Sequence, residues 1–404
     1  MWVDRHVGAA TMVARAAAAV VGVVLVGVLV GCHAPDRRGA ETPTPATSSR
    51  PPTTGSSSPV PVDRIGWSVD LGDSTEAAPA FAAGVVFVHT HHGTLAALDA
   101  RSGAVRWRVE LDGLGGSLAV AEGQLYVVSG DANMSQCRLR AFDAASGTHR
   151  WARTSRPCSA LTVGAGVAYL TVGGVVHSTG RVVEPARVVA LEADTGRQRW
   201  SVRIDSADAT LSAPVVAGRM VYFTGSAELV ALDTASGRVR WRTRFDRAGG
   251  QVSQPLIDGG LVHVVRQWGH GQSAVYAVDA RTGQRLWVSQ VRGLAAFRAP
   301  LFAANTVVVV SDDGRVRGLN HRTGRLRWVR AFGSTDRGGP PARAVSAGNT
   351  VYVSLAGRLH ALDPTTGRTV WTDPNPPPGD PLGADNGMVY LGAASGVISA
   401  VGGP

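Results

Sequence analysis

With 404 residues, a formal net charge of +10 and 50 glycines, the chain is long for one ordinary domain but suits a repeated or barrel-like architecture. Glycine-rich turns between many short strands give this composition, and a helical bundle does not. The positive charge permits contact with anionic lipid, polymer or nucleic acid but does not by itself argue for any of them.

The chain opens with an export signal. Residues 16–30 form an apolar run preceded by Arg5 and Arg15, which is the length of a signal-peptide core and short for a stable membrane span. The run ends in LVGC at 29–32, which resembles the lipobox of bacterial lipoproteins. That resemblance implies cleavage before Cys32 and lipidation of its thiol. The alternative is an uncleaved anchor helix; either places the remainder outside the cytoplasm at a membrane and disfavours nucleic acid as a partner.

A tether is expected next. Pro, Ser and Thr dominate residues 32–62, and apolar residues are too sparse there to form a core. We therefore expect a signal peptide over 1–31, a disordered tether that begins at the lipidated cysteine, and a folded domain over 63–404.

The folded part repeats an eleven-residue motif seven times, at 97–107, 141–151, 190–200, 231–241, 277–287, 318–328 and 361–371. In each copy Gly stands four residues before a closing Trp, and an acidic or amide residue stands eight before it. This pattern predicts a β-hairpin, because the Asp side chain accepts from turn amides and Gly adopts a positive φ. Another strand pair lies upstream of each copy, such as 78–81 and 84–89 in the first. Units of four short strands at a period above forty residues predict propeller blades.

The two ends complete one further unit. An eighth motif begins at Ala400 but stops at its turn, whereas residues 64–71 supply an outer strand with Trp67 and no strands before it. The N-terminal strand should therefore close an all-β, eight-bladed propeller. The equivalent tryptophans are Trp67, Trp107, Trp151, Trp200, Trp241, Trp287, Trp328 and Trp371. We expect them to pack blade against blade; a ligand-stacking surface is the alternative.

The motif A-x-D-x-x-T-G-x-x-x-W resembles the tryptophan-docking repeat of quinoprotein dehydrogenases and of PQQ-like propellers generally, including the lipoprotein of the outer-membrane β-barrel assembly machinery. The resemblance covers residues 64–404 and implies the fold more than a function. Quinoprotein dehydrogenases bind pyrroloquinoline quinone (PQQ) and Ca²⁺ in a central funnel, often beside an adjacent Cys pair. This sequence has no such pair, no alignable Ca²⁺ ligands and no hydrolase motif. We expect no catalysis and no cofactor; a PQQ- and Ca²⁺-dependent dehydrogenase is the alternative.

Binding is expected on one face of the ring. In a four-stranded blade (strands a to d from the axis outward) the a–b and c–d turns share one face, and the b–c turns and d–a links share the other. The c–d turns are uniform, whereas the b–c turns and d–a links differ in length and composition, as at 129–137, 171–186 and 266–273. Variation on a repeated scaffold is typical of binding. The candidate binding residues are His91, His92, Asp131, Asn133, His177, Trp268 and His270.

Two thiols are expected on that same face. Cys137 lies at the end of a b–c turn and Cys158 is placed in the following d–a link. Outside the cytoplasm nearby thiols oxidise, so we expect a Cys137–Cys158 disulfide. Two separate buried thiols are the alternative.

Other residues allow competing interpretations. His89, His91 and His92 could share a metal, but no fourth ligand is identifiable and no metal is expected. Trp268 is a recognition anchor if it is exposed, and otherwise packs under its own loop. Arg precedes the closing Trp in five motifs, where charge discourages edge-to-edge pairing; an anion-binding belt is the alternative.

The sequence therefore predicts a non-catalytic, membrane-tethered, extracytoplasmic monomer. It would bind a protein or envelope polymer through its variable face, with a role in envelope assembly as a narrower hypothesis.

Overall fold

Each copy of the eleven-residue motif forms the two outer strands of a four-stranded antiparallel sheet in the computed structural model. In the first copy Ala97 lies opposite Trp107, and the register shifts between Ala97 and Leu98 where the turn begins. The structure describes residues 65–75, 78–131, 136–155, 158–176, 182–204, 211–225, 228–245, 250–268, 272–292, 299–311, 314–332, 343–355, 357–377 and 380–402. Within these ranges the secondary structure is all β, and no helix is long and apolar enough to cross a membrane.

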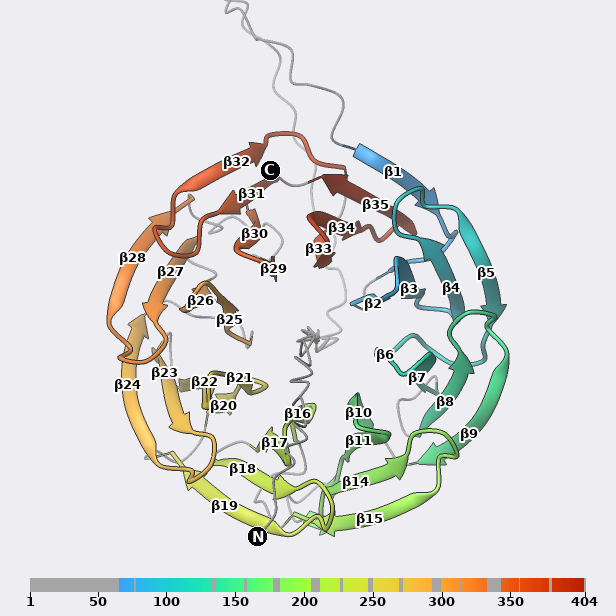
Figure 1. The fold of residues 1–404 in the computed structure, drawn as a ribbon, viewed down its shortest axis with the longest axis horizontal. Helices are drawn as coiled ribbons and strands as arrows, with labels where there is room; N and C mark the ends of the chain where they lie inside the picture. The colour runs from blue at the N-terminus through green and yellow to red at the C-terminus, as the bar shows by residue number, and fades with distance from the viewer. Residues whose placement is uncertain are drawn as a thin grey trace, which may run out of the picture.

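The eight blades are numbered 1 to 8 in chain order, beginning with the blade that contains β2 to β5. Within each blade the strands occupy four positions from the ring axis outward (Figure 1). The innermost strands are β2 (Ala80–Ala82), β6 (Leu118–Ala121), β10 (Cys158–Gly164), β16 (Val215–Ala217), β20 (Gln251–Val252) with β21 (Leu256–Asp258), β25 (Leu301–Ala303), β29 (Arg343–Ala347) and β33 (Asp380–Asp385). The second strands are β3 (Val85–His89), β7 (Gln124–Gly130), β11 (Val167–Val172), β17 (Met220–Thr224), β22 (Leu261–Trp268), β26 (Thr306–Val310), β30 (Thr350–Leu355) and β34 (Met388–Gly392).

The third strands are β4 (Thr94–Asp99), β8 (Cys137–Asp143), β14 (Arg187–Glu192), β18 (Glu228–Asp233), β23 (Gln272–Asp279), β27 (Arg315–Asn320), β31 (Arg358–Leu362) and β35 (Val397–Gly402). The outer strands are β5 (Val105–Glu110), β9 (His149–Ser155), β15 (Gln198–Arg203), β19 (Val239–Arg244), β24 (Arg285–Arg292), β28 (Leu326–Ala331), β32 (Thr369–Asp373) and β1 (Ile65–Asp70). An additional short hairpin, β12 (Val175–Val176) with β13 (Val182–Glu184), forms within the 171–186 insertion of blade 3.

The ring closes as the sequence predicts. Strand β1 pairs antiparallel with β35, so that Trp67 lies opposite Ala400 and Ser68 opposite Ser399. The hydroxyls of Ser68 and Ser399 are hydrogen-bonded at 2.7 Å. Blade 8 therefore takes its outer strand from the N-terminal side of the chain and its other three from the C-terminal side, which leaves no open edge between the first and last blades (Figure 1).

The docking tryptophans from Trp67 to Trp328 lie on the glycine turns of the next blade. The Trp241 indole donates from Nε1 to the carbonyl of Ala280 at 3.1 Å, and a Cβ added at Gly283 would lie 2.7 Å from the same ring. Because Gly283 also has φ +76°, only glycine suits both the turn and the stacked ring. The same Nε1 bond joins Trp67 to Ala100, Trp107 to Ala144, Trp151 to Ala193, Trp200 to Thr234, Trp287 to His321 and Trp328 to Pro364.

The second strands carry a further row of aromatic residues, which the sequence analysis did not predict. Ala141 lies between Trp151 on one side and Tyr126 on the other, and the two rings are 6.1 Å apart. The Tyr126 hydroxyl donates to the carbonyl of Ala193 at 3.0 Å, so one carbonyl of the next blade accepts from both rings. The signal was present in the sequence, because an aromatic residue or His stands at this register position in Phe87, Tyr126, Tyr169, Tyr222, His263, Tyr352 and Tyr390.

Candidate functional site

On the variable face, the links between blades 8, 1 and 2 are hydrogen-bonded into one platform. The backbone NH of His91 donates to Ser74 in the link before blade 1, and the carbonyl of His91 accepts from Gly115 in the link after it. Leu114 and Gly130 exchange two backbone hydrogen bonds at 2.8 and 3.1 Å. Each link therefore threads between two b–c turns and joins neighbouring blades at this face.

Glycines make this threading possible. A Cβ at Gly116 would lie 2.1 Å from the carbonyl oxygen of Val128, and one at Gly115 would lie 2.5 Å from that of Thr90. Such distances do not occur for real Cβ atoms, so any larger residue would push the link away from the turns. The sequence GLGG at 113–116 is therefore what holds the platform closed.

His91 and His92 lie at the surface of this platform. The rings are 4.9 Å apart and meet edge to face. His92 bonds to Asp73 through both its backbone NH and its Nδ1, with 2.7 Å between Nδ1 and Oδ1, while 76% of its side chain remains exposed. Burial alone would raise the pKa of Asp73, but the hydrogen bonds from His92, Thr90 and Ser74 hold that pKa well below its usual range. The platform therefore presents an oriented imidazole on a fixed carboxylate.

His89 lies beneath the platform and is 1% exposed. Its Nδ1 accepts from the backbone NH of Gly116 at 3.2 Å, and its buried Nε2 has no hydrogen-bond partner among the described residues. Burial lowers the pKa of His89 to about 4, and the nearby positive charge of Arg140 acts in the same direction. This imidazole is therefore neutral at pH 7 and supports the link.

A buried arginine fixes the blade 2 side of the platform. The Arg140 guanidinium, of which 6% is exposed, donates to the Ser129 hydroxyl at 2.7 Å and to the Asp112 carboxylate. Arg138 donates to the same carboxylate from a more exposed position. Burial raises the pKa of Asp112, but the charge of Arg140 and the other contacts lower that pKa by a larger amount, so the net shift is downward. These charges cross-brace the d–a link to strand β8.

The remaining candidate residues lie beside the platform, in another sector or outside the described residues. Oδ1 of Asp131 accepts from the backbone NH of Gln136 at 3.1 Å and closes the b–c turn of blade 2. Trp268 is partly buried against the core of blades 4 and 5, and the Arg266 guanidinium lies 5.6 Å from its ring centroid. Trp268 is thus partly buried against the core of blades 4 and 5 and flanked by Arg266. Asn133, His177 and His270 lie outside the described residues.

Cys137 and Cys158 each begin a strand, in blades 2 and 3. Cys137 begins β8, is 4% exposed and is disulfide-bonded. Cys158 begins β10, so its expected place in a d–a link is wrong: the innermost strand of blade 3 starts earlier than the sequence pattern indicated. The side chain of Cys158 lies outside the described residues, so the pairing of the two cysteines stays a prediction.

The arginines that precede the docking tryptophans are less available than an anion-binding belt requires. Arg106 pairs with the motif carboxylate Asp99, and Arg150 and Arg240 pair equivalently with Asp143 and Asp233. The hydrogen bond from Arg150 holds the pKa of Asp143 down to about 2, together with those from the Ser146 amide and hydroxyl. In blades 1, 2 and 4 this arginine therefore serves the motif turn.

The described residues bring few metal-ligating side chains together. No set of three or more His, Cys, Asp or Glu side chains converges within the described ranges in a way that could hold a metal. His91, His92 and Asp73 come together, but Asp73 is already engaged by His92 and by the Ser74 amide.

Known proteins resemble the chain along its whole folded part. The family model described as outer membrane protein assembly factor BamB matches residues 61–210, 184–340 and 336–402. The crystal structure of BamB from Moraxella catarrhalis superposes with a TM-score of 0.64 at 18% identity, over 84% of this chain and 99% of that one. At this identity the likeness concerns the fold.

Curated relatives match shorter stretches. Quinoprotein ethanol dehydrogenase from Pseudomonas putida is 30% identical over 25% of this chain and 20% of its own length. The serine/threonine-protein kinase AfsK from Streptomyces coelicolor is 30% identical over 37% of this chain and 16% of its own length. Outer membrane protein assembly factor BamB from Yersinia pestis is 28% identical over 26% of each. The matches thus span 26% or less of these relatives. Since the family model covers nearly all of the folded part and the fold agrees, the chain belongs to the family described as outer membrane protein assembly factor BamB.

Proposed function

We propose that the chain is a non-catalytic, membrane-tethered propeller that binds an extracytoplasmic protein through the face formed by its b–c turns and d–a links. The platform of blades 8, 1 and 2 carries this proposal, because it is braced by hydrogen bonds and glycine contacts yet presents the exposed His92 and the neighbouring His91. A rigid, preorganised surface loses little entropy on binding. Membership of a family named for outer membrane protein assembly supports a partner in envelope assembly.

Two positions in blade 1 test the choice of face. His92 lies in the b–c turn and Arg101 in the c–d turn, and both are exposed. A photo-crosslinking residue at 92 in the intact cell should capture a discrete protein, and one at 101 should not. Adducts at 101 alone would place binding on the uniform face and overturn the proposal. An envelope polymer as partner would instead give a heterogeneous, protease-resistant adduct at 92, which also contradicts a protein partner.

The tether forms a separate part of the proposal. Cys32 follows an apolar run and precedes a Pro-rich segment, which supports lipidation at that thiol. Labelling with a lipid precursor should mark the full chain, and Cys32→Ser should abolish the label and shift the protein out of the membrane fraction. A Cys32→Ser protein that stays with membranes would favour an uncleaved anchor.

The dehydrogenase alternative derives from the match to quinoprotein ethanol dehydrogenase. Adding PQQ and Ca²⁺ to the purified chain and assaying dye-linked alcohol oxidation tests it. Quinone absorbance retained after gel filtration, together with turnover, would overturn the non-catalytic proposal.

A further inference from the structure

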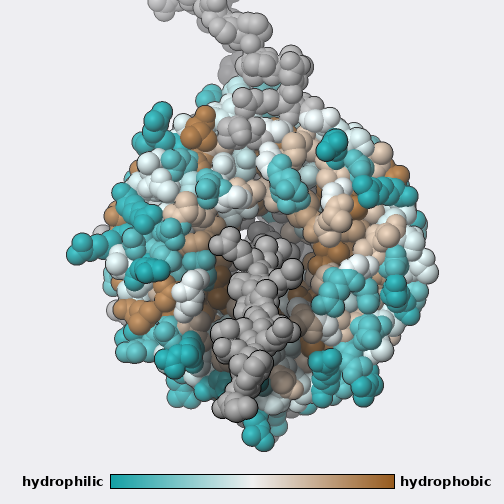
Figure 2. All heavy atoms as spheres, in the orientation of Figure 1, coloured by the Kyte–Doolittle hydropathy of each residue, from teal (hydrophilic) through white to brown (hydrophobic). Residues whose placement is uncertain are grey.

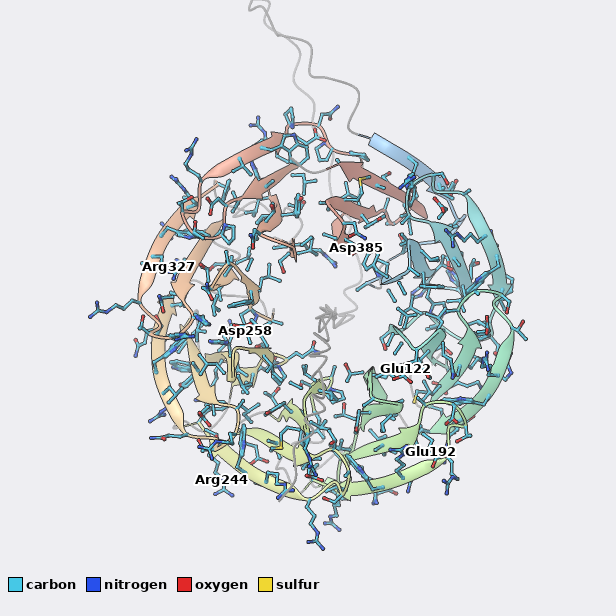
Figure 3. The ribbon with its side chains drawn as sticks, in the orientation of Figure 1. Glu122, Glu192, Arg244, Asp258, Arg327 and Asp385 are labelled. Carbon is cyan, nitrogen blue, oxygen red and sulfur yellow. The ribbon has the colours of Figure 1, made fainter. Side chains whose placement is uncertain are left out.

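The outer hairpin of blade 6 is rich in arginine and lacks the motif acid. Residues 314–332 contain six arginines and no Asp or Glu. The motif acid of the other blades is Asn320 here, so Arg327 has no motif carboxylate and donates instead to the Thr306 hydroxyl at 2.7 Å. Figure 3 labels Arg327 on this outer hairpin. None of Arg322, Arg325, Arg327 and Arg330 forms an ion pair within the described residues.

The same edge exposes aliphatic side chains. Leu326 and Val329 on β28 are 56% and 42% exposed, and Leu286 and Val288 on the neighbouring β24 are 48% and 44% exposed. Figure 2 shows hydrophobic surface at this edge of the ring among hydrophilic residues. On β28 only Trp328 is buried, so every other side chain of the strand faces solvent.

Other blades use these positions differently. The residues flanking Trp107 and Trp241 are arginines, and their partners are carboxylates: Arg108 pairs with Glu110 and Arg242 with Glu228. In blades 5 and 6 the residues that follow the tryptophan are Val288 and Val329. Blades 1 and 4 thus pair these arginines with carboxylates and expose one valine each on the outer strand, whereas the outer strands of blades 5 and 6 expose two aliphatic side chains each.

We propose that the outer edge of blades 5 and 6 docks on the surface of an anionic lipid bilayer. Arginines beside exposed aliphatic residues suit this occupant, since headgroup phosphates attract the guanidinium groups and the interfacial region accepts the aliphatic side chains. A soluble polyanion would leave Leu326 and Val329 without a role. The inference rests on the proposed tether, which would keep the propeller within reach of the bilayer. Strand β1, where the described chain begins, lies on the same outer edge two blades from β28 (Figure 1).

Hydrogen–deuterium exchange on the full lipidated chain tests the contact. The protein is reconstituted on phosphatidylglycerol-containing vesicles and on phosphatidylcholine vesicles. The outward amides of β28 and β24 should exchange about tenfold more slowly on the anionic vesicles, with the difference lost in high salt. Strands β5 and β19 serve as internal references and should not change. Equal exchange on both vesicles would overturn the proposal, even though flotation with the vesicles still supports the tether.

A matched pair of variants identifies the docking residues. Leu326→Glu with Val329→Glu should return β28 to its exchange rate on phosphatidylcholine. Val105→Glu with Val239→Glu changes residues that are 49% and 40% exposed on blades 1 and 4, and should leave the protection intact. Protection that persists in the first pair contradicts the proposal. Protection of β28 that requires added envelope protein, and not anionic lipid, would make this edge a protein interface and would also contradict it.

Discussion

The motif glycine has two roles, and only one of them could be predicted from the sequence. Gly103 has φ +74°, as a tight hairpin turn requires, and the Trp67 ring of the neighbouring blade lies where its Cβ would be. The first role could be predicted from the turn composition around Asp99, whose carboxylate accepts from the backbone amides of Arg101 and Ser102. The second could not, because spacing within one motif does not reveal which residue of another blade covers it.

Two glycines of blade 1 separate these roles. Gly84 has φ +73° with no atom near its absent Cβ, whereas a Cβ at Gly103 would lie 2.6 Å from the Trp67 ring. We expect Gly84→Ala to cost about 1 kcal/mol from backbone strain alone. Gly103→Ala should cost about 2 kcal/mol more because Trp67 must move. Urea denaturation measures both, and equal losses would show that the stacked ring does not depend on the glycine.

At the scale of elements, the links determine how firmly the variable face is held. The link between blades 1 and 2 accepts a hydrogen bond from blade 2 through Leu114 and donates to His89 of blade 1 through Gly116. The sequence predicted that such links vary, and on that ground it predicted binding on this face. It did not predict that a buried histidine and a buried arginine would anchor one of them, because alternation along a strand does not show which polar residue is covered by a distant segment.

Acidification should loosen this link. The pKa of His89 is about 4 in the folded chain against 6.5 for a free imidazole, with Arg140 and Asp73 as the charged neighbours. The unfolded chain therefore binds the proton first, so the stability contributed by neutral His89 is complete above pH 6.5 and is lost as the pH falls toward 4. The loss is about 3 kcal/mol. His263 and His360 have pKa values lowered by burial and act in the same direction.

His89→Asn isolates this contribution, because an amide oxygen can still accept from the Gly116 amide. Free energies of unfolding measured at several values between pH 7 and 4 should fall less steeply for the variant than for the parent. Identical slopes would mean that the proton is taken up elsewhere.

At the scale of the whole molecule, closure gives the interface between blades 8 and 1 the same docking contacts as an interface inside the ring. The Trp67 interface joins blade 8 to blade 1, and the Trp241 interface joins blade 4 to blade 5, with the same Nε1 bond and the same glycine contact. In an open array of repeats an end interface can separate without the rest, whereas a closed ring has no end. The number of blades and the closing strand could be predicted because the truncated motif and the isolated outer strand are complementary in sequence.

Trp67→Ala and Trp241→Ala test this equivalence. Each should cost about 3–5 kcal/mol in a single cooperative transition. A small loss for Trp67→Ala, or a separate early transition in blade 8, would indicate an open array. Calorimetry beside chemical denaturation distinguishes these results.

The candidate site was less predictable than the ring. Loop variability selected the face for the prediction, and His91 and His92 lie together on that face. Asp131 closes its own turn beside the platform, whereas Trp268 packs in the sector of blades 4 and 5. Composition can show which loops differ between the repeated blades. It cannot distinguish a residue that closes its own turn from one that a partner contacts, because both are polar residues in loops.

Pairing of β1 with β35 also has a consequence in time. During synthesis β1 is the first of the described strands to be made and β35 the last, so their hydrogen bonds cannot form until nearly all of the propeller has been made. Until then Trp67 has the glycine turn of blade 1 to pack on but no third strand of its own blade beside it. Blades 1 to 7 can form in order as they are made, whereas blade 8 must wait. The final ring-closing step therefore joins the oldest strand to the newest.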